Sequence, residues 1–343
     1  MAVVLNANPL TGTLTHESSV TITGTGFGTK SPAAPAVWDD FSGEAADNGP
    51  PDTTATIGTW SGVGDNSDMH MVGDAAYLYG CGTRAVHLDG TGNGRDLIYN
   101  YSTPNNGSIY MYCKRRYASV FEHEANAKHL YIYPASGTYP SPLATWHYEW
   151  GALNKNYVNA GVQTCDLSNP GYVEVTSTFP QPGVWETDEY IIKNNSAVDA
   201  SDGEFRFDWN GTTLFDRTNV IFRSTAESGT MTIFHYSNYG AIVAMDLADH
   251  YFDITWSRVM ICTGSTWAAR GVSEIQIPTA WADGSVTVTV NMGAFTVDSV
   301  TRYLYVVDSA GLVNDSGYPV TFGTTYGDNS IYIPNPGDIR IIP

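Results

Sequence analysis

The carboxylates of the segment WETDEY, residues 185 to 190, have a type and spacing that could do acid–base chemistry. Residues two apart in a β-strand lie on one face, so Glu186 and Asp188 would share a face while Glu189 lies on the other. Retaining hydrolysis of a glycosidic bond needs two carboxyl groups about 5 Å apart, one on each side of the bond. A solvated strand end explains the same acids equally well, so this segment does not by itself establish a hydrolase.

A second group of candidates could remove a proton beside a uronate carboxylate. A lyase of that kind uses a Tyr or His as base and a neutralising Arg, Gln or Asn. His129, Tyr131 and Tyr133 occupy alternate positions of KHLYIYP and would share one strand face. In TWHYEW, His147 and Tyr148 would lie on opposite faces. If the chain is a lyase, we expect the catalytic residues to be His129, Tyr131 and Tyr148.

The same aromatic strands could bind a sugar without changing it. Stacking of Tyr or Trp rings on pyranose rings, with a few polar groups, is what a carbohydrate site requires. Packing within a sheet explains each of these residues at least as well. The candidate ligand-binding residues are Tyr110, Tyr112, Arg116, Tyr131, Tyr133, Trp146, Tyr148 and Lys193.

The composition is that of an acidic, mostly β protein. The 343 residues include 35 Asp plus Glu against 16 Lys plus Arg, a formal net charge of -19. Because this charge repels the polyanion of DNA or RNA, no nucleic-acid partner is expected. The chain has 22 tyrosines and 34 glycines but no long stretch of helical apolar periodicity, which favours strands.

The sequence has neither an apolar run long enough to span a membrane nor a signal peptide at its N-terminus. Its composition is otherwise typical of an exported protein. A virion protein released by lysis fits both facts, and so does a secreted protein whose leader has been replaced by Met1. Either way we expect a place on a virion or at an extracellular surface.

Residues 38–264 read as many short strands separated by turns. Their order resembles a concanavalin A-like jelly roll of the laminin-G and polysaccharide-lyase type. The resemblance rests on Asp-Asp-Phe at 39–41, an aromatic strand ending in Lys114-Arg115, the hairpin DGEFRFDWNG at 202–211 and Tyr-Phe-Asp-Ile at 251–254. It implies a two-layered β-sandwich for this part of the chain.

The enzyme signatures of such jelly rolls are incomplete in this sequence. Jelly-roll glucanases carry a Glu-x-Asp-x-Glu row, and Tyr190 stands where the third acid should be. The Gln-Ile-His motif of alginate lyases is also missing, since Gln276-Ile277 is followed by Pro278. These departures favour a lectin-like jelly roll without catalysis.

Two separated segments resemble the halves of an immunoglobulin-like domain of the TIG type. One is VTITGTGFG within residues 1–37, and the other is WADGSVTVTV followed by YLYVVD within residues 265–324. We expect one sandwich built from both segments, with the jelly roll inserted between its early strands and an extended tail over residues 325–343. In the alternative, residues 1–37 add edge strands to the jelly roll and residues 265–324 fold independently.

Jelly rolls of this type often hold a structural Ca²⁺ between the first and the last strand. Acids occur at both places, Asp39 and Asp40 at the start and Asp253 near the end, and hard oxygen ligands suit this ion. Four cysteines, at positions 81, 113, 165 and 262, lack zinc-binding spacing. Buried thiols are favoured over a Cys81–Cys113 disulfide.

These observations predict an all-β protein made of a jelly-roll sandwich plus an immunoglobulin-like β-sandwich. We expect a non-catalytic virion or cell-surface structural or adhesion protein, such as a phage decoration or fibre component with a lectin-like, carbohydrate-binding jelly roll. Carbohydrate or other virion proteins are the expected partners, and a homo-oligomer remains open. The alternative function is an extracellular polysaccharide lyase that acts on a uronate polysaccharide.

Overall fold

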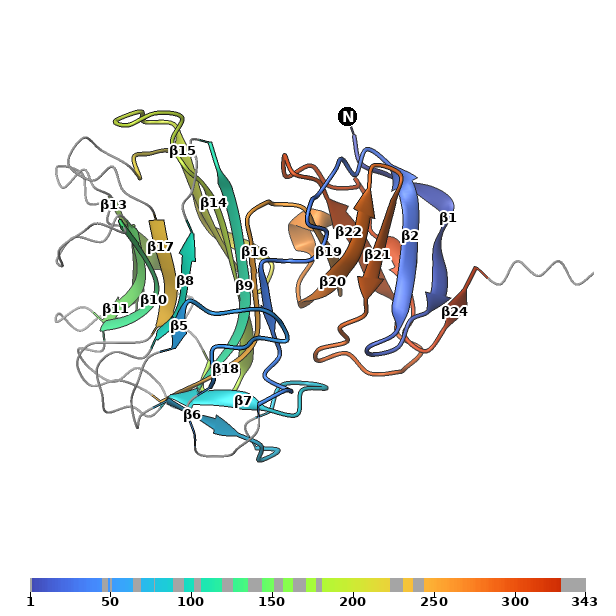
Figure 1. The fold of residues 1–343 in the computed structure, drawn as a ribbon, viewed down its shortest axis with the longest axis horizontal. Coiled ribbons are helices and arrows are strands. Elements are labelled where there is room, and N and C mark those ends of the chain that lie inside the picture. The colour runs from blue at the N-terminus through green and yellow to red at the C-terminus, as the bar shows by residue number, and fades with distance from the viewer. Residues whose placement is uncertain are drawn as a thin grey trace, which may run out of the picture.

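The computed structural model confirms an all-β protein with a jelly-roll sandwich. It describes residues 2–44, 49, 51–63, 69–76, 78–88, 96–101, 106–118, 126–134, 144–150, 157–162, 171–176, 181–222, 231–236 and 244–327. Within these ranges the helical structure is one 3-10 turn at Trp267–Ala269, and no helix is long and apolar enough to cross a membrane. Antiparallel sheets make up the rest of the regular structure (Figure 1).

One layer of the jelly roll, which we call the junction sheet, is central to the molecule. Its nine strands include a path of seven with β9 and β18 in the middle, while β7 pairs with β18 and β6 with β7. The path runs through β16 (Thr212–Val220), β15 (Gly203–Trp209), β14 (Trp185–Lys193), β9 (Ser108–Tyr117), β18 (Met245–Asp253), β3 (Val37–Asp39) and β4 (Ile57–Gly58), and the two others are β7 (Ala85–Leu88) and β6 (Met69–Val72).

The second layer, the distal sheet, has seven strands. In order they are β13 (Gly171–Thr176), β12 (Tyr157–Val162), β11 (Ala144–Trp150), β10 (Asn126–Pro134), β17 (Met231–Tyr236), β8 (Asp96–Tyr101) and β5 (Gly62–Val63). Alternate residues of the junction sheet, such as Phe205 and Phe207, enter the core between the layers. Tyr99 of β8 packs on Phe252 of β18 with ring centroids 4.3 Å apart, which ties the two layers together.

Strands from both ends of the chain form a second sandwich, the terminal sandwich. Val20 and Ile22 of β2 alternate with more exposed residues, as do Val286 and Val288 of β21, and the two strands pair directly. This pairing places the first strands of the chain beside the last ones (Figure 1). The strand path is β23 (Tyr318–Val320), β22 (Arg302–Val307), β19 (Arg258–Cys262), β20 (Ser273–Ala282), β21 (Ser285–Thr289), β2 (Ser19–Thr25), β1 (Val4–Thr13) and β24 (Thr325–Tyr326).

Two details differ from the sequence analysis. The sequence analysis assigned residues 38–264 to the jelly roll, but the last jelly-roll strand, β18, ends at Asp253, and β19 begins at Arg258. Because β19 pairs with β20 and β22, residues 258–262 belong to the terminal sandwich and not to the jelly roll. Of the predicted tail, β24 pairs with β1, and residues 328–343 lie outside the described part of the chain.

The terminal sandwich covers the outer face of the junction sheet. Strand β18 is buried along its whole length, and β9 along nearly all of it, because one face contacts the jelly-roll core and the other contacts the terminal sandwich. A separate apolar cluster fills this junction and contains Tyr110 and Tyr251 from the jelly roll with Met260 and Ile275 from the terminal sandwich. The molecule therefore has a broad interface between its two sandwiches.

Candidate functional site

The structure removes Tyr110 and Tyr112 from the predicted sugar-binding set. Both lie on the outer face of β9, at the junction, with 0% and 1% of their surface exposed. The Tyr110 hydroxyl donates to Glu189 Oε2 at 2.9 Å, and the Tyr112 hydroxyl donates to the carbonyl of Ser273 at 2.9 Å. These rings hold the two sandwiches together and cannot reach a sugar.

The paired acids of β14 also have a structural role. Glu186 and Asp188 do share a face, but that face is turned into the jelly roll, where both bind the buried guanidinium of Arg115. Arg115 Nη1 donates to Glu186 at 3.0 Å and Nη2 donates to Asp188 at 2.9 Å. Burial raises the pKa of Glu186 to about 7, although Arg115 opposes this effect. Two sealed carboxylates on one guanidinium cannot flank a glycosidic bond, so the hydrolase interpretation fails.

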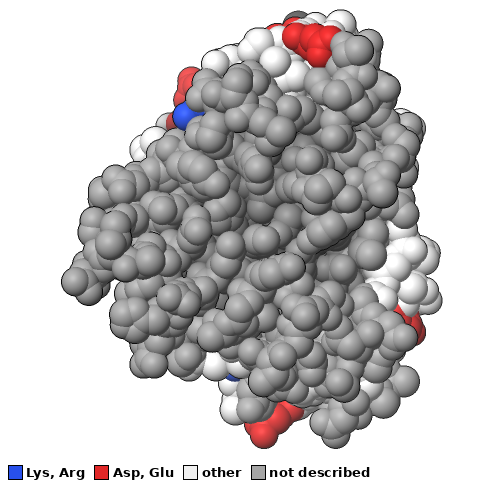
Figure 2. Space-filling view, turned by 90° about the vertical axis from the view of Figure 1, so that its left-hand side faces the viewer, with Lys and Arg blue, Asp and Glu red and all other residues white. Residues whose placement is uncertain are grey.

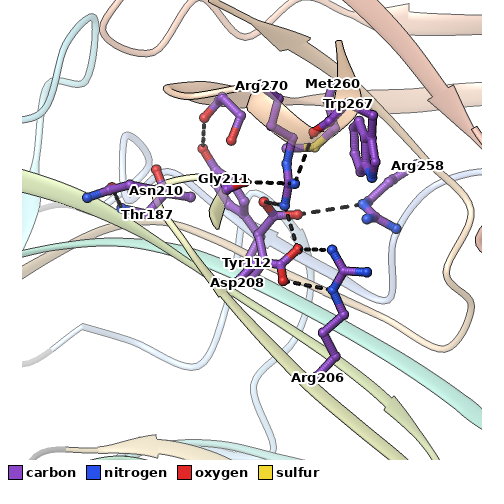
Figure 3. A network of polar contacts seen from close by, with 12 residues as sticks. Tyr112, Thr187, Arg206, Asp208, Asn210, Gly211, Arg258, Met260, Trp267 and Arg270 are labelled. Atoms are coloured by element: carbon purple, nitrogen blue, oxygen red, sulfur yellow. Dashed lines mark hydrogen bonds and ion pairs between the residues drawn. The ribbon is translucent and has the colours of Figure 1, made fainter. Parts of the chain in front are cut away.

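The third acid of that strand, Glu189, lies on the opposite face and joins a network across the junction. Figure 3 shows this network with Arg206, Asp208 and Arg270 labelled. Arg270 of the terminal sandwich donates from Nη2 to Glu189 at 2.9 Å and to Asp208 at 2.6 Å. Arg206 binds both oxygens of Asp208 at 2.7 Å. Burial alone would raise the pKa of Asp208, but the hydrogen bond from Arg206 and the charges of Arg270 and Arg206 lower it.

The two predicted polar anchors are already paired. Arg116 donates from Nη2 to Asp246 at 2.7 Å and stacks over the Trp185 ring, with 5.3 Å from the guanidinium carbon to the ring centroid. Lys193 lies 2.7 Å from Glu204 in a half-exposed ion pair. Both belong to the junction sheet, so neither lies beside the aromatic strands of the distal sheet.

The three predicted calcium ligands do not converge. Asp39 faces the jelly-roll core and accepts a hydrogen bond from Trp60 Nε1 at 2.8 Å, and burial raises its pKa to about 7. Asp253 faces the junction, where it pairs with Lys30 at 2.6 Å. The Asp40 carboxylate accepts a hydrogen bond from the Thr56 hydroxyl at 2.7 Å. Within the described residues no cluster of three or more such ligands exists, and calcium binding itself stays a prediction.

The thiols are placed largely as the sequence analysis favoured. Cys113 and Cys262 are buried and Cys81 is half-buried, and no disulfide joins Cys81 to Cys113. Burial raises the pKa of both buried thiols. Cys165 lies outside the described residues.

The remaining predicted residues lie in the distal sheet, whose strands are described by backbone and register. Tyr131 pairs with Thr145 on β11 and with Phe234 on β17. Trp146 pairs with Leu130, and Tyr148 pairs with Ala127. The side chains of His129, Tyr131, Tyr133, Trp146 and Tyr148 lie outside the described part of the structure.

A pocket that the sequence analysis missed opens at the junction. Its volume is about 230 Å³. Ile191, Arg206 and Asp216, neighbours across β14, β15 and β16, form one side, and Trp256, Arg258 and Trp267 form the other. No sequence motif links these residues, because the strands that carry them meet only when the two sandwiches pack together.

Comparisons with known proteins add structural likenesses only. No protein-family model matches the chain, and no curated protein matches it. The solved structure of alginate lyase Aly36B is 14% identical over 64% of this chain and 98% of its own, with a TM-score of 0.47. An endo-β-1,4-glucuronan lyase from the fungus Trichoderma reesei is 13% identical over 65% of this chain and 96% of its own, with a TM-score of 0.41. A carbohydrate esterase from the Shiga toxin-encoding bacteriophage phi24B is 13% identical over 64% of this chain and 98% of its own, with a TM-score of 0.42.

Proposed function

We propose that this chain is a non-catalytic carbohydrate-binding protein displayed on the surface of a virion or a cell. In this proposal the jelly roll binds sugar with its distal sheet, and the terminal sandwich is the base that carries it. The observation behind the proposal is that the terminal sandwich covers the junction sheet, while the distal sheet lies on the far side of the jelly roll (Figure 1). Figure 2 views the molecule from that side, and the charged residues described at its margins are mostly acidic.

The junction contains buried ion pairs, which support the proposed display role. Lys114 of β9 lies 3.3 Å from Glu274 of β20, and Lys30 reaches Asp253 at 2.6 Å, with all four side chains nearly sealed from solvent. Moving the sandwiches apart would leave these buried charges uncompensated, so the pairs favour the observed contact between the jelly roll and its base.

The register of the distal sheet narrows the predicted binding residues. Residues paired across an antiparallel ladder lie on one face. Leu97 and Tyr99 of β8 face the core, so the row between them, Ile98–Phe234–Tyr131, lies on the outer face. By the same alternation the row Asn100–Thr232–Tyr133 is also outward.

The other two aromatic positions of the predicted set fall on the opposite face. Leu130 precedes Tyr131 in β10, so its position is on the opposite face of the sheet, the face of Leu97. Trp146 is the ladder partner of Leu130 and is therefore on that face too. Tyr148 is two residues after Trp146 and shares its face. We therefore assign sugar binding to Tyr131 and Tyr133, whose rows also contain Thr232 and Asn100, and not to Trp146 and Tyr148, which occupy positions on the opposite face of the sheet.

We further propose that the terminal sandwich is the split immunoglobulin-like domain of the sequence analysis. The pairing of β2 with β21 supports this, because it joins a strand before the jelly roll to a strand after it. An inserted domain attached at both ends is restrained more than one on a single linker.

Binding to a panel of neutral and acidic polysaccharides tests the proposal. Tyr131→Ala and Tyr133→Ala should each weaken binding about two- to tenfold, since ring stacking contributes about 0.5–1.5 kcal/mol. Tyr131→Phe is the matched control and should bind as the wild type, because it keeps the ring. Binding that survives both alanine substitutions together would contradict the proposed surface.

The lyase alternative is decided in the same samples by ultraviolet absorbance of an unsaturated uronate product. Turnover that disappears in His129→Ala would overturn the non-catalytic proposal. Absence of turnover together with co-purification on intact particles or cells is the expected result.

A further inference from the structure

The junction pocket holds an arginine whose charge is only partly matched. Three guanidinium groups, those of Arg206, Arg258 and Arg270 (Figure 3), lie beside the buried carboxylates of Glu189 and Asp208. Arg206 and Arg270 both bind Asp208, and Arg270 also binds Glu189. Arg206 and Arg270 therefore make the short contacts with these carboxylates, and Arg258 has only a longer ion pair with Glu189.

Arg258 is nonetheless buried, with 3% of its surface exposed. Its Nε lies 3.8 Å from Glu189, beyond hydrogen-bond reach, and among the described residues this nitrogen has no hydrogen-bond partner. The Nη1 group donates to the carbonyl of Trp256 at 2.9 Å. A buried guanidinium held by one carbonyl, one long ion pair and aromatic faces carries a desolvation cost that a further anionic acceptor would offset.

The walls around Arg258 suit a sugar ring. The guanidinium lies 4.3 Å from the Tyr110 ring centroid and 5.5 Å from that of Trp267. Trp256 and Trp267 both line the pocket, and indole faces are the surfaces on which pyranose rings stack. The volume of about 230 Å³ is below the range of about 300–1,000 Å³ typical of drug-sized ligands, so the ligand is small.

Two acids at the pocket limit the charge of that ligand. Glu204 pairs with Lys193 at 2.7 Å, and Asp216 is the ladder partner of Arg206. Their carboxylates can accept hydrogen bonds from sugar hydroxyls, and they repel a ligand with several negative charges. A phosphate or a polysulfate is disfavoured relative to a single carboxylate.

We propose that the junction pocket binds one acidic monosaccharide unit, with its carboxylate at Arg258 and its ring against the indoles of Trp256 and Trp267. The site lies on the outer face of the junction sheet, so it is separate from the sugar surface proposed on the distal sheet and does not depend on it. Such a site would let the protein engage a uronate at the base of the jelly roll.

Titration with glucuronate and with glucose, followed by ligand-observed NMR, tests this inference. Glucuronate should bind at least about tenfold more tightly than glucose, because only glucuronate has a carboxylate that can accept a charge-assisted hydrogen bond from Arg258. Arg258→Gln should abolish that preference. The matched control is Arg302→Gln, an arginine of the same sandwich that pairs with Asp298 and does not line the pocket.

A second variant protects the test against loss of folding in Arg258→Gln. Ala310 is exposed and lines the pocket, so Ala310→Trp should fill the opening, leave the buried charges in place and abolish glucuronate binding. Tyr131→Ala should bind glucuronate at this site as the wild type does. Equal affinity for glucose and glucuronate, no saturable binding of glucuronate, or equal losses in Arg258→Gln and Arg302→Gln would each overturn the proposal.

Discussion

Arg270 of the terminal sandwich lies 2.9 Å from Glu189 of the jelly roll, and neither side chain exposes more than 1% of its surface. The same nitrogen of Arg270 lies 2.6 Å from Asp208 on the neighbouring strand. One side chain from the base therefore links two strands of the jelly roll. Because this cluster is buried and its charges are paired, the junction is a structural interface and not a loose contact between domains.

Replacement of Arg270 tests how much this link stabilises the protein. Arg270→Met leaves Glu189 and Asp208 buried with less compensation, and the free energy of unfolding should fall by about 3–5 kcal/mol. Lys193→Met, which breaks a half-exposed ion pair, is the control and should cost about 1 kcal/mol or less. Urea unfolding of both variants gives the comparison, and equal effects would show that the junction cluster contributes no more than a surface pair.

Close backbone contacts across the junction give a second prediction. Gly80 has a φ of +52°, and a Cβ there would overlap the carbonyl of Gly293 in the terminal sandwich, whose oxygen also accepts from Cys81 N at 2.9 Å. Gly183 has a φ of +73° with open space around it among the described residues. Gly183→Ala should cost about 1–2 kcal/mol from its backbone conformation alone. Gly80→Ala should carry the same backbone cost and a further cost of about 1–3 kcal/mol for the overlap with Gly293.

Melting temperature and limited proteolysis separate these two contributions. Only Gly80→Ala should make the junction more susceptible to proteases, because only that substitution pushes the sandwiches apart. If both alanine variants melted and digested alike, the close approach of Gly80 to Gly293 would not matter for stability.

Stability should rise as the pH falls from alkaline toward mildly acidic values. Burial raises the pKa of Asp39, Glu186 and Asp249 to about 7 each. Between the unfolded and the folded pKa values, these carboxyl groups are therefore protonated in the folded state and ionised in the unfolded chain. The stabilisation from a raised carboxyl pKa is complete below the unfolded value, near 4, and is lost as the pH rises through the folded value of about 7.

The corresponding measurement is urea unfolding at about pH 5 and at about pH 8. Asp249→Asn should reduce the difference between the two pH values by on the order of 1 kcal/mol, because it removes one of the three groups. The amide can still accept the hydrogen bond that Asn291 Nδ2 donates at 3.0 Å. Thr279→Val on the exposed side of β20 is the control and should leave the difference unchanged, and a wild-type protein more stable at the alkaline pH would contradict the argument.

Local sequence patterns were sufficient for much of the fold. Val20 and Ile22, like Val286 and Val288, alternate with polar residues, and this period identified the paired strands of the terminal sandwich. The hairpin at 203–220 was also readable, because Asn210-Gly211 supplies two positive φ values of 47° and 76° at its turn.

The sites were harder to predict, because they depend on which layer covers each face. Alternation shows that Tyr110 and Tyr112 share a face of β9, but it does not show that the terminal sandwich covers that face. Likewise the period of WETDEY does not reveal that Arg115 lies between the two acids. Arg206, Trp256 and Trp267 come from separate segments, so their common pocket follows only from the packing of the two sandwiches.

The last prediction concerns the split of the terminal sandwich. A protease site inserted between Ser31 and Pro32, in an exposed loop, should be cut without loss of structure. The N-terminal fragment should stay bound, because β2 pairs with β21, β1 pairs with β24, and Val20 and Ile22 belong to the core of the terminal sandwich. Native gel filtration should give one species that resolves into two fragments in denaturant. Release of the short fragment under native conditions would instead support independent folding of the C-terminal strands.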